Sequence, residues 1–316
     1  MNKRRIGRSD LYVHPFCFGG NVFGWTADET MSHQLLDAFV DAGFEFIDTA
    51  DVYSRWAPGH RGGESEEVIG RWLAKSGKRD RIVLATKVGM DMGGENTGLK
   101  PDYIARAVED SLRRLKTDRI DLYQAHRDDD QTPLEDTLRA FEKLVREGKA
   151  RVIGASNYTA GRLSQALDVS EREGLPRYEC LQPHYNLVER AEFEKDLAGL
   201  CARREIGVIP YFSLAAGFLT GKYRSEDDLE KSVRGPRTAG KYLNPKGLRV
   251  LAALDDVAAA HSATPAQVAL AWTMARAPVT APIASATNLH QLHELIGAVR
   301  LNLSSADMRA LDAASA

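Results

Sequence analysis

A single strand–helix–strand unit between residues 81 and 126 decides the fold class. It reads RIVLATKV (81–88), PDYIARAVEDSLRRL (101–115) and RIDLYQAH (119–126). The outer two stretches are short and apolar, and the middle one has helical periodicity with Pro101 at a favoured first-turn position. This order is typical of two parallel strands joined by a helix that packs outside the sheet.

The same alternation extends along the whole chain, with further helical segments from Met31 to Ala42 and from Thr132 to Gly148. Barrels of alternating strands and helices reach this length as one domain. We therefore predict an α/β fold, a single (β/α)8 TIM barrel over residues 1–316. Its eight strands are expected at Phe16–Gly19, Phe44–Thr49, Ile82–Val88, Ile120–Ala125, Arg151–Ala155, Cys180–Gln182, Val208–Tyr211 and Val279–Ile283.

Three segments interrupt this repeat. The first, Arg4 to Val13, has a turn-like Gly-Arg-Ser-Asp between short alternating stretches, which predicts an N-terminal hairpin closing the barrel floor. The second, residues 53–63, follows the second predicted strand. The third, residues 213–245, follows the seventh strand, where barrels place ligand-binding loops.

The composition argues against nucleic-acid and membrane partners. A formal net charge of −2 creates no broad field to attract either of them. No apolar run reaches the roughly 20 residues of a membrane span, and no signal-peptide region is present, so we expect a cytoplasmic protein. Cys17, Cys180 and Cys201 are far apart, which suits neither a disulfide framework nor a zinc site, and we expect no metal.

Four polar residues stand where apolar runs stop, and barrels place catalytic groups at such strand ends. Asp48 lies near the end of the second predicted strand, and Tyr53 follows it by five residues. Lys87 lies at the end of the third strand, and His126 directly follows the fourth. A Tyr or Lys beside one strand is usually structural, but placement at three strand ends points to a shared site.

These four residues suit the reduction of a carbonyl group, in which hydride reaches carbon while a positioned acid protonates oxygen. Tyr53 is the natural acid. Because a free phenol has a pKa of about 10, a cation such as Lys87 is needed beside it to stabilise the phenolate. Asp48 would hold the lysine charged, and His126 would donate to the carbonyl oxygen and orient it.

Several longer motifs follow one another along the chain. They are FEFIDTADVYS (44–54), GGESEEVIG (62–70), LATKVG (84–89), DLYQAHRDDDQTPLEDTL (121–138), GKARVIGASNY (148–158), LQPHYNLVER (181–190) and PYFSLAAGFLTGKY (210–223). With these motifs in this order and spacing, the chain resembles the aldo-keto reductases, specifically their bacterial and potassium-channel β-subunit-like branch. The resemblance covers nearly the whole chain, implies a (β/α)8 barrel and maps the family's catalytic tetrad onto the same four residues.

The resemblance also implies how a nicotinamide cofactor is held. Ser156, Asn157 and Gln182 match positions that hold its carboxamide, and Tyr211 matches an aromatic residue that stacks on the ring. The alternative for Ser156 and Asn157 is a purely structural role as a helix cap. The pyrophosphate would lie under the loop residues Leu214, Gly217, Leu219, Gly221 and Lys222, and the adenosine phosphate would meet the segment with Ser285, Thr287, Asn288, Gln291 and Glu294.

This sequence departs from the family pattern at three places. Phe212 and Ser213 replace the usual Ser-Pro after Tyr211. No Arg or Lys stands near Thr287 and Asn288, although a 2′-phosphate normally attracts one, so NADH is plausible beside the NADPH that the family implies. Basic residues on the long loop, Arg224, Arg234 and Arg237, could add charge there. An insertion after the catalytic tyrosine carries Trp56, which we expect to line the substrate pocket.

Two other functions are weighed against a reductase of aldehydes or ketones. A cofactor-binding regulatory or redox-sensing subunit of a protein complex would use the same barrel and show a persistent partner with slow turnover. A Schiff-base enzyme would use Lys87 as a neutral amine. The physiological carbonyl substrate, the direction of reaction and the oligomeric state are not readable from the sequence.

Overall fold

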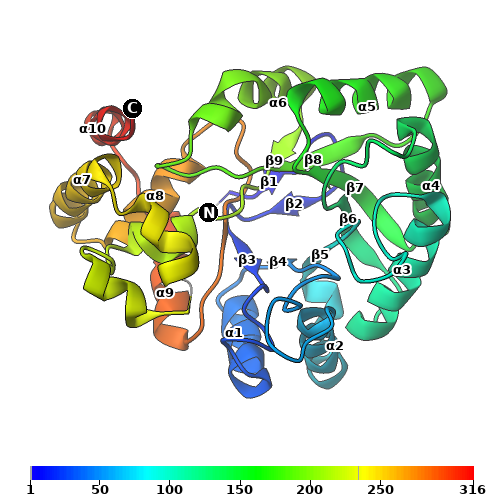
Figure 1. Cartoon of the computed structure of the whole chain (residues 1–316), viewed down its shortest axis with the longest axis horizontal. Helices are drawn as coiled ribbons and strands as arrows, with labels where there is room; N and C mark the ends of the chain where they lie inside the picture. The colour runs from blue at the N-terminus through cyan, green and yellow to red at the C-terminus, as the bar shows by residue number, and fades with distance from the viewer. Residues whose placement is uncertain (1, 234) are drawn as a thin grey trace.

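A parallel sheet curls around the centre of the molecule, and helices surround it (Figure 1). The structure is a computed structural model that describes residues 2–233 and 235–316. Within that part of the chain, eight strands pair in parallel in the order β10-β3-β4-β5-β6-β7-β8-β9, which confirms the predicted barrel fold. The strands are β3 (Cys17–Gly19), β4 (Phe46–Asp48), β5 (Val83–Val88), β6 (Ile120–Ala125), β7 (Ala150–Ser156), β8 (Tyr178–Gln182), β9 (Gly207–Val208) and β10 (Ile283–Ala284).

Each predicted strand has a counterpart, but the second and the last two are much shorter than expected, since β4 has three residues and β9 and β10 have two each. Pro210 and Pro282 lack a backbone N–H and interrupt the ladder on either side of the closing seam. Isolated contacts still join the two edges of the sheet. Val208 bridges Val279 in parallel, and the backbone N–H of Ile283 donates to the Pro210 carbonyl at 2.9 Å.

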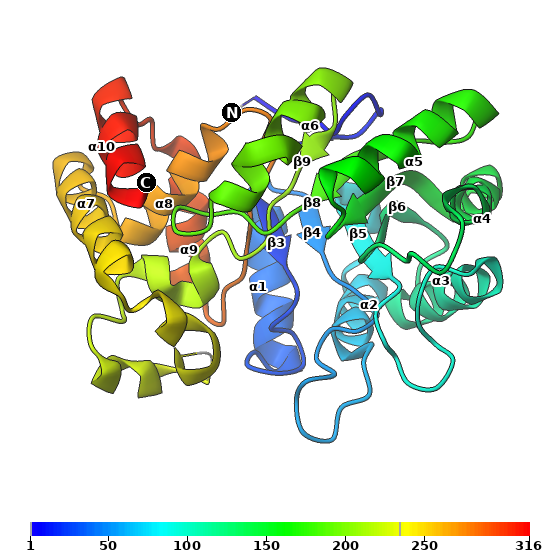
Figure 2. The same cartoon turned by 45° about the horizontal axis from the view of Figure 1, so that its top comes forward.

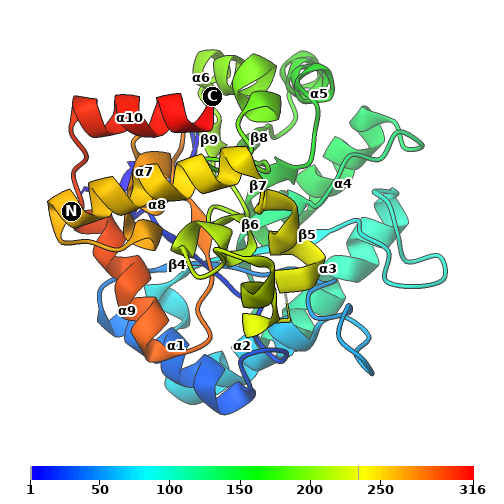
Figure 3. The same ribbon diagram turned by 60° about the vertical axis from the view of Figure 1, so that its left-hand side comes forward.

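The helices follow the strands and cover the outside of the barrel. Helices α7 and α10 are additional to the repeat and lie beside each other (Figure 3). None of the helices in the described part of the chain is long and apolar enough to cross a membrane. The α-helices are α1 (Glu29–Asp41), α2 (Glu64–Ser76), α3 (Pro101–Leu115), α4 (Leu134–Arg146), α5 (Ala160–Glu173), α6 (Ala198–Arg204), α7 (Pro245–His261), α8 (Pro265–Met274), α9 (Leu289–Gly297) and α10 (Ser305–Ser315). Shorter 3-10 or π turns are η1 (Arg79–Arg81), η2 (Phe193–Leu197), η3 (Ala215–Thr220), η4 (Glu226–Lys231), η5 (Gly235–Ala239), η6 (Gly240–Tyr242) and η7 (Ala298–Arg300).

The expected N-terminal hairpin is present and closes one end of the barrel. Strands β1 (Arg4–Arg5) and β2 (Tyr12–Val13) pair antiparallel, and Figure 2 shows them at the end opposite the loops after β4 and β5. Ile6, Leu11 and Val13 are buried against side chains that point inward from the barrel strands. The floor is therefore sealed with apolar residues, and the opposite end is left for a ligand.

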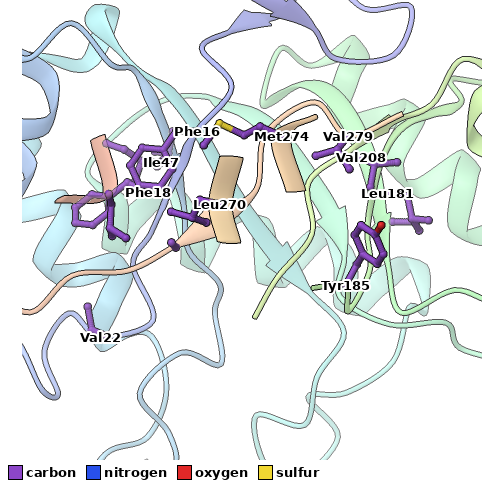
Figure 4. Close-up of a cluster of buried hydrophobic side chains, with 14 of the residues drawn as sticks. Phe16, Phe18, Val22, Ile47, Leu181, Tyr185, Val208, Leu270, Met274 and Val279 are labelled. Atoms are coloured by element: carbon purple, nitrogen blue, oxygen red, sulfur yellow. The ribbon is translucent and has the colours of Figure 1, made fainter. Parts of the chain in front are cut away.

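A second apolar layer lies between the strands and the surrounding helices. Figure 4 shows part of it, with the buried side chains of Phe16, Phe18 and Ile47 close together. Cys17, Cys180 and Cys201 are all buried and free. The scaffold under the open end is thus packed on both faces of the sheet, which fixes the strand ends that carry the polar residues.

Candidate active site

The four residues singled out in the sequence meet at the open end of the barrel. Asp48 is the last residue of β4, Lys87 lies near the end of β5, and His126 directly follows β6. The Lys87 ammonium donates to Asp48 Oδ2 at 2.7 Å, to the Thr49 carbonyl at 2.7 Å and to the Tyr53 hydroxyl at 2.8 Å. All three of its N–H donors therefore have acceptors.

Two glutamines complete the surroundings of Asp48. The side-chain amides of Gln124 and Gln182 donate to Asp48 Oδ1 at 3.3 and 3.0 Å. Asp48 and Lys87 are completely buried, and a buried ion pair needs such extra hydrogen bonds to be stable. Gln124 was not among the residues predicted from the sequence, because the strand-end criterion selects ionisable groups and Gln124 is not ionisable. The alternation of β6 was the available signal, since Gln124 lies two residues before His126.

The electrostatics of Tyr53 differ from the expectation in direction. Burial and then the nearby Asp48 carboxylate raise the pKa of Tyr53 well above its ordinary value, although Lys87 lies beside it. The Lys87 ammonium does lie beside the Tyr53 hydroxyl, as predicted, but its charge does not outweigh the loss of solvent. The phenol consequently keeps its proton at neutral pH, which is the state that a proton donor requires.

His126 lies beside the phenol and borders the same space. Its ring centroid is 6.0 Å from that of Tyr53, with the rings nearly perpendicular. Burial and then the Lys87 charge lower the pKa of His126 well below its ordinary value, so the imidazole is neutral near pH 7. Its Nδ1 is buried without a hydrogen-bond partner in the described part of the chain.

A cavity of about 670 Å³ opens above the tetrad. This volume is within the usual range for sites that hold small molecules and cofactors. Asp48 and Lys87 lie beneath it, Leu219 is buried in the core, and neither Gly221 nor Asn288 reaches the lining. The other predicted site residues do line it, namely Tyr53, Trp56, His126, Ser156, Asn157, Gln182, Tyr211, Leu214, Gly217, Lys222, Ser285, Thr287, Gln291 and Glu294.

Comparison with known proteins identifies the family of this barrel. The model of the aldo/keto reductase family matches residues 15–316. The chain belongs to the aldo/keto reductase family. This membership supports a carbonyl-reducing oxidoreductase, and it agrees with the resemblance drawn from the motifs.

Individual relatives align along nearly their whole length. Uncharacterized oxidoreductase YrpG of Bacillus subtilis (strain 168) is 36% identical, with 99% of this chain and 95% of the relative covered. A Schizosaccharomyces pombe aldo-keto reductase, yakc, whose name specifies NADP(+), is 33% identical with 97% and 89% covered. A putative voltage-gated potassium channel subunit beta from the same yeast is 33% identical with 94% and 87% covered.

In this aldo/keto reductase, the residues expected at the nicotinamide end form one hydrogen-bonded set. The Tyr211 hydroxyl donates to Asn157 Oδ1 at 2.8 Å, and Asn157 Nδ2 donates to the His126 carbonyl at 2.9 Å. Asn157 has a φ of +56°, and the cap of α5 is Thr159, so the Ser-Asn pair is not a helix cap. The local backbone instead turns both polar side chains toward the cavity.

The loop after β9 provides room for a phosphate-bearing ligand. Gly217 has a φ of +92°, a conformation that favours glycine, and a Cβ placed there would lie 3.2 Å from Lys222 Cε. Lys222 and Lys231 both line the cavity on this side. The cavity thus combines a flat ring at Tyr211 with cations at the loop, and this donor set fits a nicotinamide dinucleotide.

The other expected basic residues do not contribute in the same way. Arg224 makes a two-pronged ion pair with Asp255, with distances of 2.7 and 2.8 Å. Arg234 and the side chain of Arg237 lie outside the described residues. At the N-terminal turn of α9, Gln291 Oε1 accepts from the backbone N–H of Thr287 at 2.8 Å. No Arg or Lys among the described lining residues comes from this helix.

Proposed function

We propose that this protein reduces aldehydes or ketones to alcohols, with Tyr53 as the proton donor. One observation carries the proposal: the Tyr53 hydroxyl accepts from the buried Lys87 ammonium at 2.8 Å while it borders a cavity of cofactor size. A bound nicotinamide would supply the hydride. The protein's own side chains would bind the cofactor, orient the carbonyl group and transfer the proton.

Proton transfer is assigned to the Tyr53 hydroxyl. Its own hydrogen bond to Asp48 Oδ2 is long, at 3.3 Å, so a carbonyl oxygen in the cavity can compete for the proton. As the proton leaves, negative charge develops on the phenol oxygen, and Lys87 already donates to that atom. Asp48 keeps the lysine charged throughout, since it accepts from the ammonium at 2.7 Å.

His126 is assigned an orienting role, because a neutral imidazole can donate one hydrogen bond to a carbonyl oxygen. Asn157 and the Gln182 oxygen are the proposed partners of the carboxamide, and Tyr211 is the proposed platform for the ring. NADPH is the proposed cofactor, with Lys222 and Lys231 near its phosphates. NADH is the alternative, because α9 presents Glu294 and no basic side chain to the cavity.

The test is the loss of absorbance of the reduced nicotinamide with a panel of aldehydes and ketones, using NADPH and NADH in parallel. Tyr53→Phe should lower kcat by roughly a hundredfold to ten-thousandfold while the Kd for cofactor stays within about twofold, because only the proton donor is removed. A Tyr53→Phe enzyme with unchanged kcat would disprove the assignment. The two cofactor series measure the preference directly.

The regulatory-subunit alternative has support from the similarity to a relative named as a channel β subunit. The same assay separates the two functions, since a regulatory subunit would bind cofactor and reduce none of the carbonyls. The Schiff-base alternative is disfavoured by geometry. All three N–H donors of Lys87 are engaged by Asp48, Thr49 and Tyr53, so the amine is held as an ammonium and is not a free nucleophile.

A further inference from the structure

Two large aromatic side chains remain exposed at the mouth of the cavity. Trp56 is 45% exposed and Phe212 is 37% exposed, and both line the cavity. They follow β4 and β9, which are separated in the barrel by β3 and β10. Exposed aromatic side chains that border a binding cavity mark a place where a ligand covers them.

Neighbouring rings hold Trp56 in place. Its ring centroid is 5.6 Å from that of Trp25 and 5.8 Å from that of Tyr53, and the contact with Trp25 is edge-to-face. These separations are in the favourable range for aromatic pairs. The tryptophan therefore forms a fixed wall directly beside the proposed proton donor, although it is carried by a loop.

Phe212 is held in an unfavourable backbone conformation. Its φ is +53°, in the left-handed region that bulky residues rarely adopt. Asn186 Nδ2 donates to the Phe212 carbonyl at 2.9 Å, and the ring packs 5.6 Å from His184. Such strain is kept where the surroundings fix it, and it concentrates at ligand-binding sites.

Charges are distributed unequally around the cavity. Among the described lining residues, Lys222, Lys231 and Glu294 carry full charges, and all three come from the loop after β9 or from α9. The lining near Tyr53, Trp56 and His126 contributes none. Arg55, next to Trp56 in the chain, pairs with Asp91 at 3.3 Å. A charged group on the substrate would lose water here without gaining a partner.

We propose that Trp56 and Phe212 form an aromatic clamp that selects neutral aromatic aldehydes and ketones. The flat substrate ring lies between the two side chains, and its carbonyl oxygen points down to Tyr53. This proposal rests on the proposed reductase function and adds the substrate class. It disfavours substrates with a carboxylate or phosphate near the carbonyl, because no Lys or Arg lines this half of the cavity.

The test compares kcat/KM for benzaldehyde, para-carboxybenzaldehyde and cyclohexanecarbaldehyde at saturating cofactor. Benzaldehyde and para-carboxybenzaldehyde differ by one negative charge. Benzaldehyde and cyclohexanecarbaldehyde differ in whether the ring is flat and aromatic. The variants are Trp56→Ala, Trp56→Leu and Phe212→Ala, with Tyr12→Ala as the matched control. Tyr12 is 51% exposed but belongs to the hairpin at the far end of the barrel.

The wild type should use benzaldehyde at least about tenfold better than para-carboxybenzaldehyde. Its preference for benzaldehyde over cyclohexanecarbaldehyde should shrink about threefold to tenfold in each clamp variant and stay constant in Tyr12→Ala. The ratio of kcat/KM for benzaldehyde to kcat/KM for cyclohexanecarbaldehyde cancels general effects of a substitution on folding and on proton transfer. Equal use of the charged aldehyde, or an unchanged ratio in the Trp56 and Phe212 variants, would overturn the clamp. An enzyme that reduces none of the three while binding cofactor would instead overturn the proposed function.

Discussion

Two buried aspartates that are three residues apart in the chain have opposite surroundings. Asp48 points into the barrel, where Lys87, Tyr53, Gln124 and Gln182 all donate to its oxygens. Asp51 is equally buried, yet neither of its carboxyl oxygens makes a well-formed hydrogen bond with a described residue. The adjacent backbone amide of Val52 interacts with it weakly.

The difference lies in what surrounds each carboxyl group. Burial and then the charge of Glu66 raise the pKa of Asp51 to about 8. The opposing charge of Arg114, which pairs with Glu66 at 2.7 Å, does not outweigh them. Asp51 is therefore mostly protonated at neutral pH, whereas Asp48 has a cation of its own. Within one short segment, the fold keeps a charge where chemistry is proposed and removes it where none is needed.

The largest effect should follow from breaking the Asp48–Lys87 pair. Lys87→Met leaves a buried carboxylate without its cation, and it should lower the free energy of unfolding by about 3–5 kcal/mol. It should also lower kcat/KM by roughly a hundredfold to ten-thousandfold, because the hydrogen bond to the Tyr53 oxygen is lost. Urea unfolding and steady-state kinetics measure the two effects separately.

A double variant separates the structural from the chemical contribution. Asp48→Asn combined with Lys87→Met removes both charges, so most of the stability should return while activity stays low. If the double variant were as unstable as Lys87→Met alone, packing around the lysine stem would be the cause. If it regained activity, the proposed role of the ammonium beside Tyr53 would be wrong.

The second-largest effect concerns Asp51 and the dependence of the protein's stability on pH. The pKa of Asp51 is about 8 in the folded protein and about 3.9 in an unfolded chain, so the folded state holds the proton more tightly. The stability of the wild type should therefore fall as the pH rises from about 4 to about 8. Asp51→Asn removes that fall and should be more stable than the wild type at pH 9 by a few kcal/mol.

Unfolding midpoints in urea from pH 5 to pH 9 measure this difference. Asp227→Asn, at an exposed position on η4, is the control and should track the wild type throughout. A constant offset between Asp51→Asn and the wild type at all pH values would mean that Asp51 does not gain its proton on folding.

The fold was predictable because its signals are local and repeated. The α3 and β6 boundaries coincide with those expected, since Pro101 opens the helix and the apolar run of β6 is unbroken. The expected strands at 208–211 and 279–283 were too long. Pro210 and Pro282 were visible in the sequence, but which edge each proline faces depends on barrel closure, a long-range property.

The sequence predicted which strand-end residues come together in the candidate site, but it did not predict the direction in which the pKa of Tyr53 is shifted. Strand ends located Asp48, Lys87 and His126, because parallel strands bring their carboxyl ends to one edge. The direction of the pKa of Tyr53 was not predictable, since it depends on how much burial outweighs the nearby cation. The unpartnered carboxyl group of Asp51 and the positive φ of Phe212 were not predictable either, because both arise only from the three-dimensional arrangement.

A smaller effect concerns the neutral His126. Because burial lowers the pKa of His126 well below its ordinary value, kcat/KM should stay constant between about pH 6 and pH 8, with no histidine ionisation in that range. His126→Asn keeps an N–H donor and should cost about tenfold in kcat/KM with the same flat profile. A step near pH 6.5 that vanishes in His126→Asn would show that the imidazole titrates and acts as an acid.

The smallest effect should come from a charge pair at the surface. Arg224 and Asp255 are both exposed, with side chains 42% and 46% accessible, so their contact is screened by solvent. Arg224→Ala should change the free energy of unfolding by less than about 1 kcal/mol and the Kd for NADPH by less than about twofold. Lys222→Ala, in contrast, removes a cation that lines the cavity and should weaken NADPH binding more, most strongly at low salt. If both variants weakened binding equally, the field of the whole loop would attract the cofactor, and direct lining by Lys222 would not be decisive.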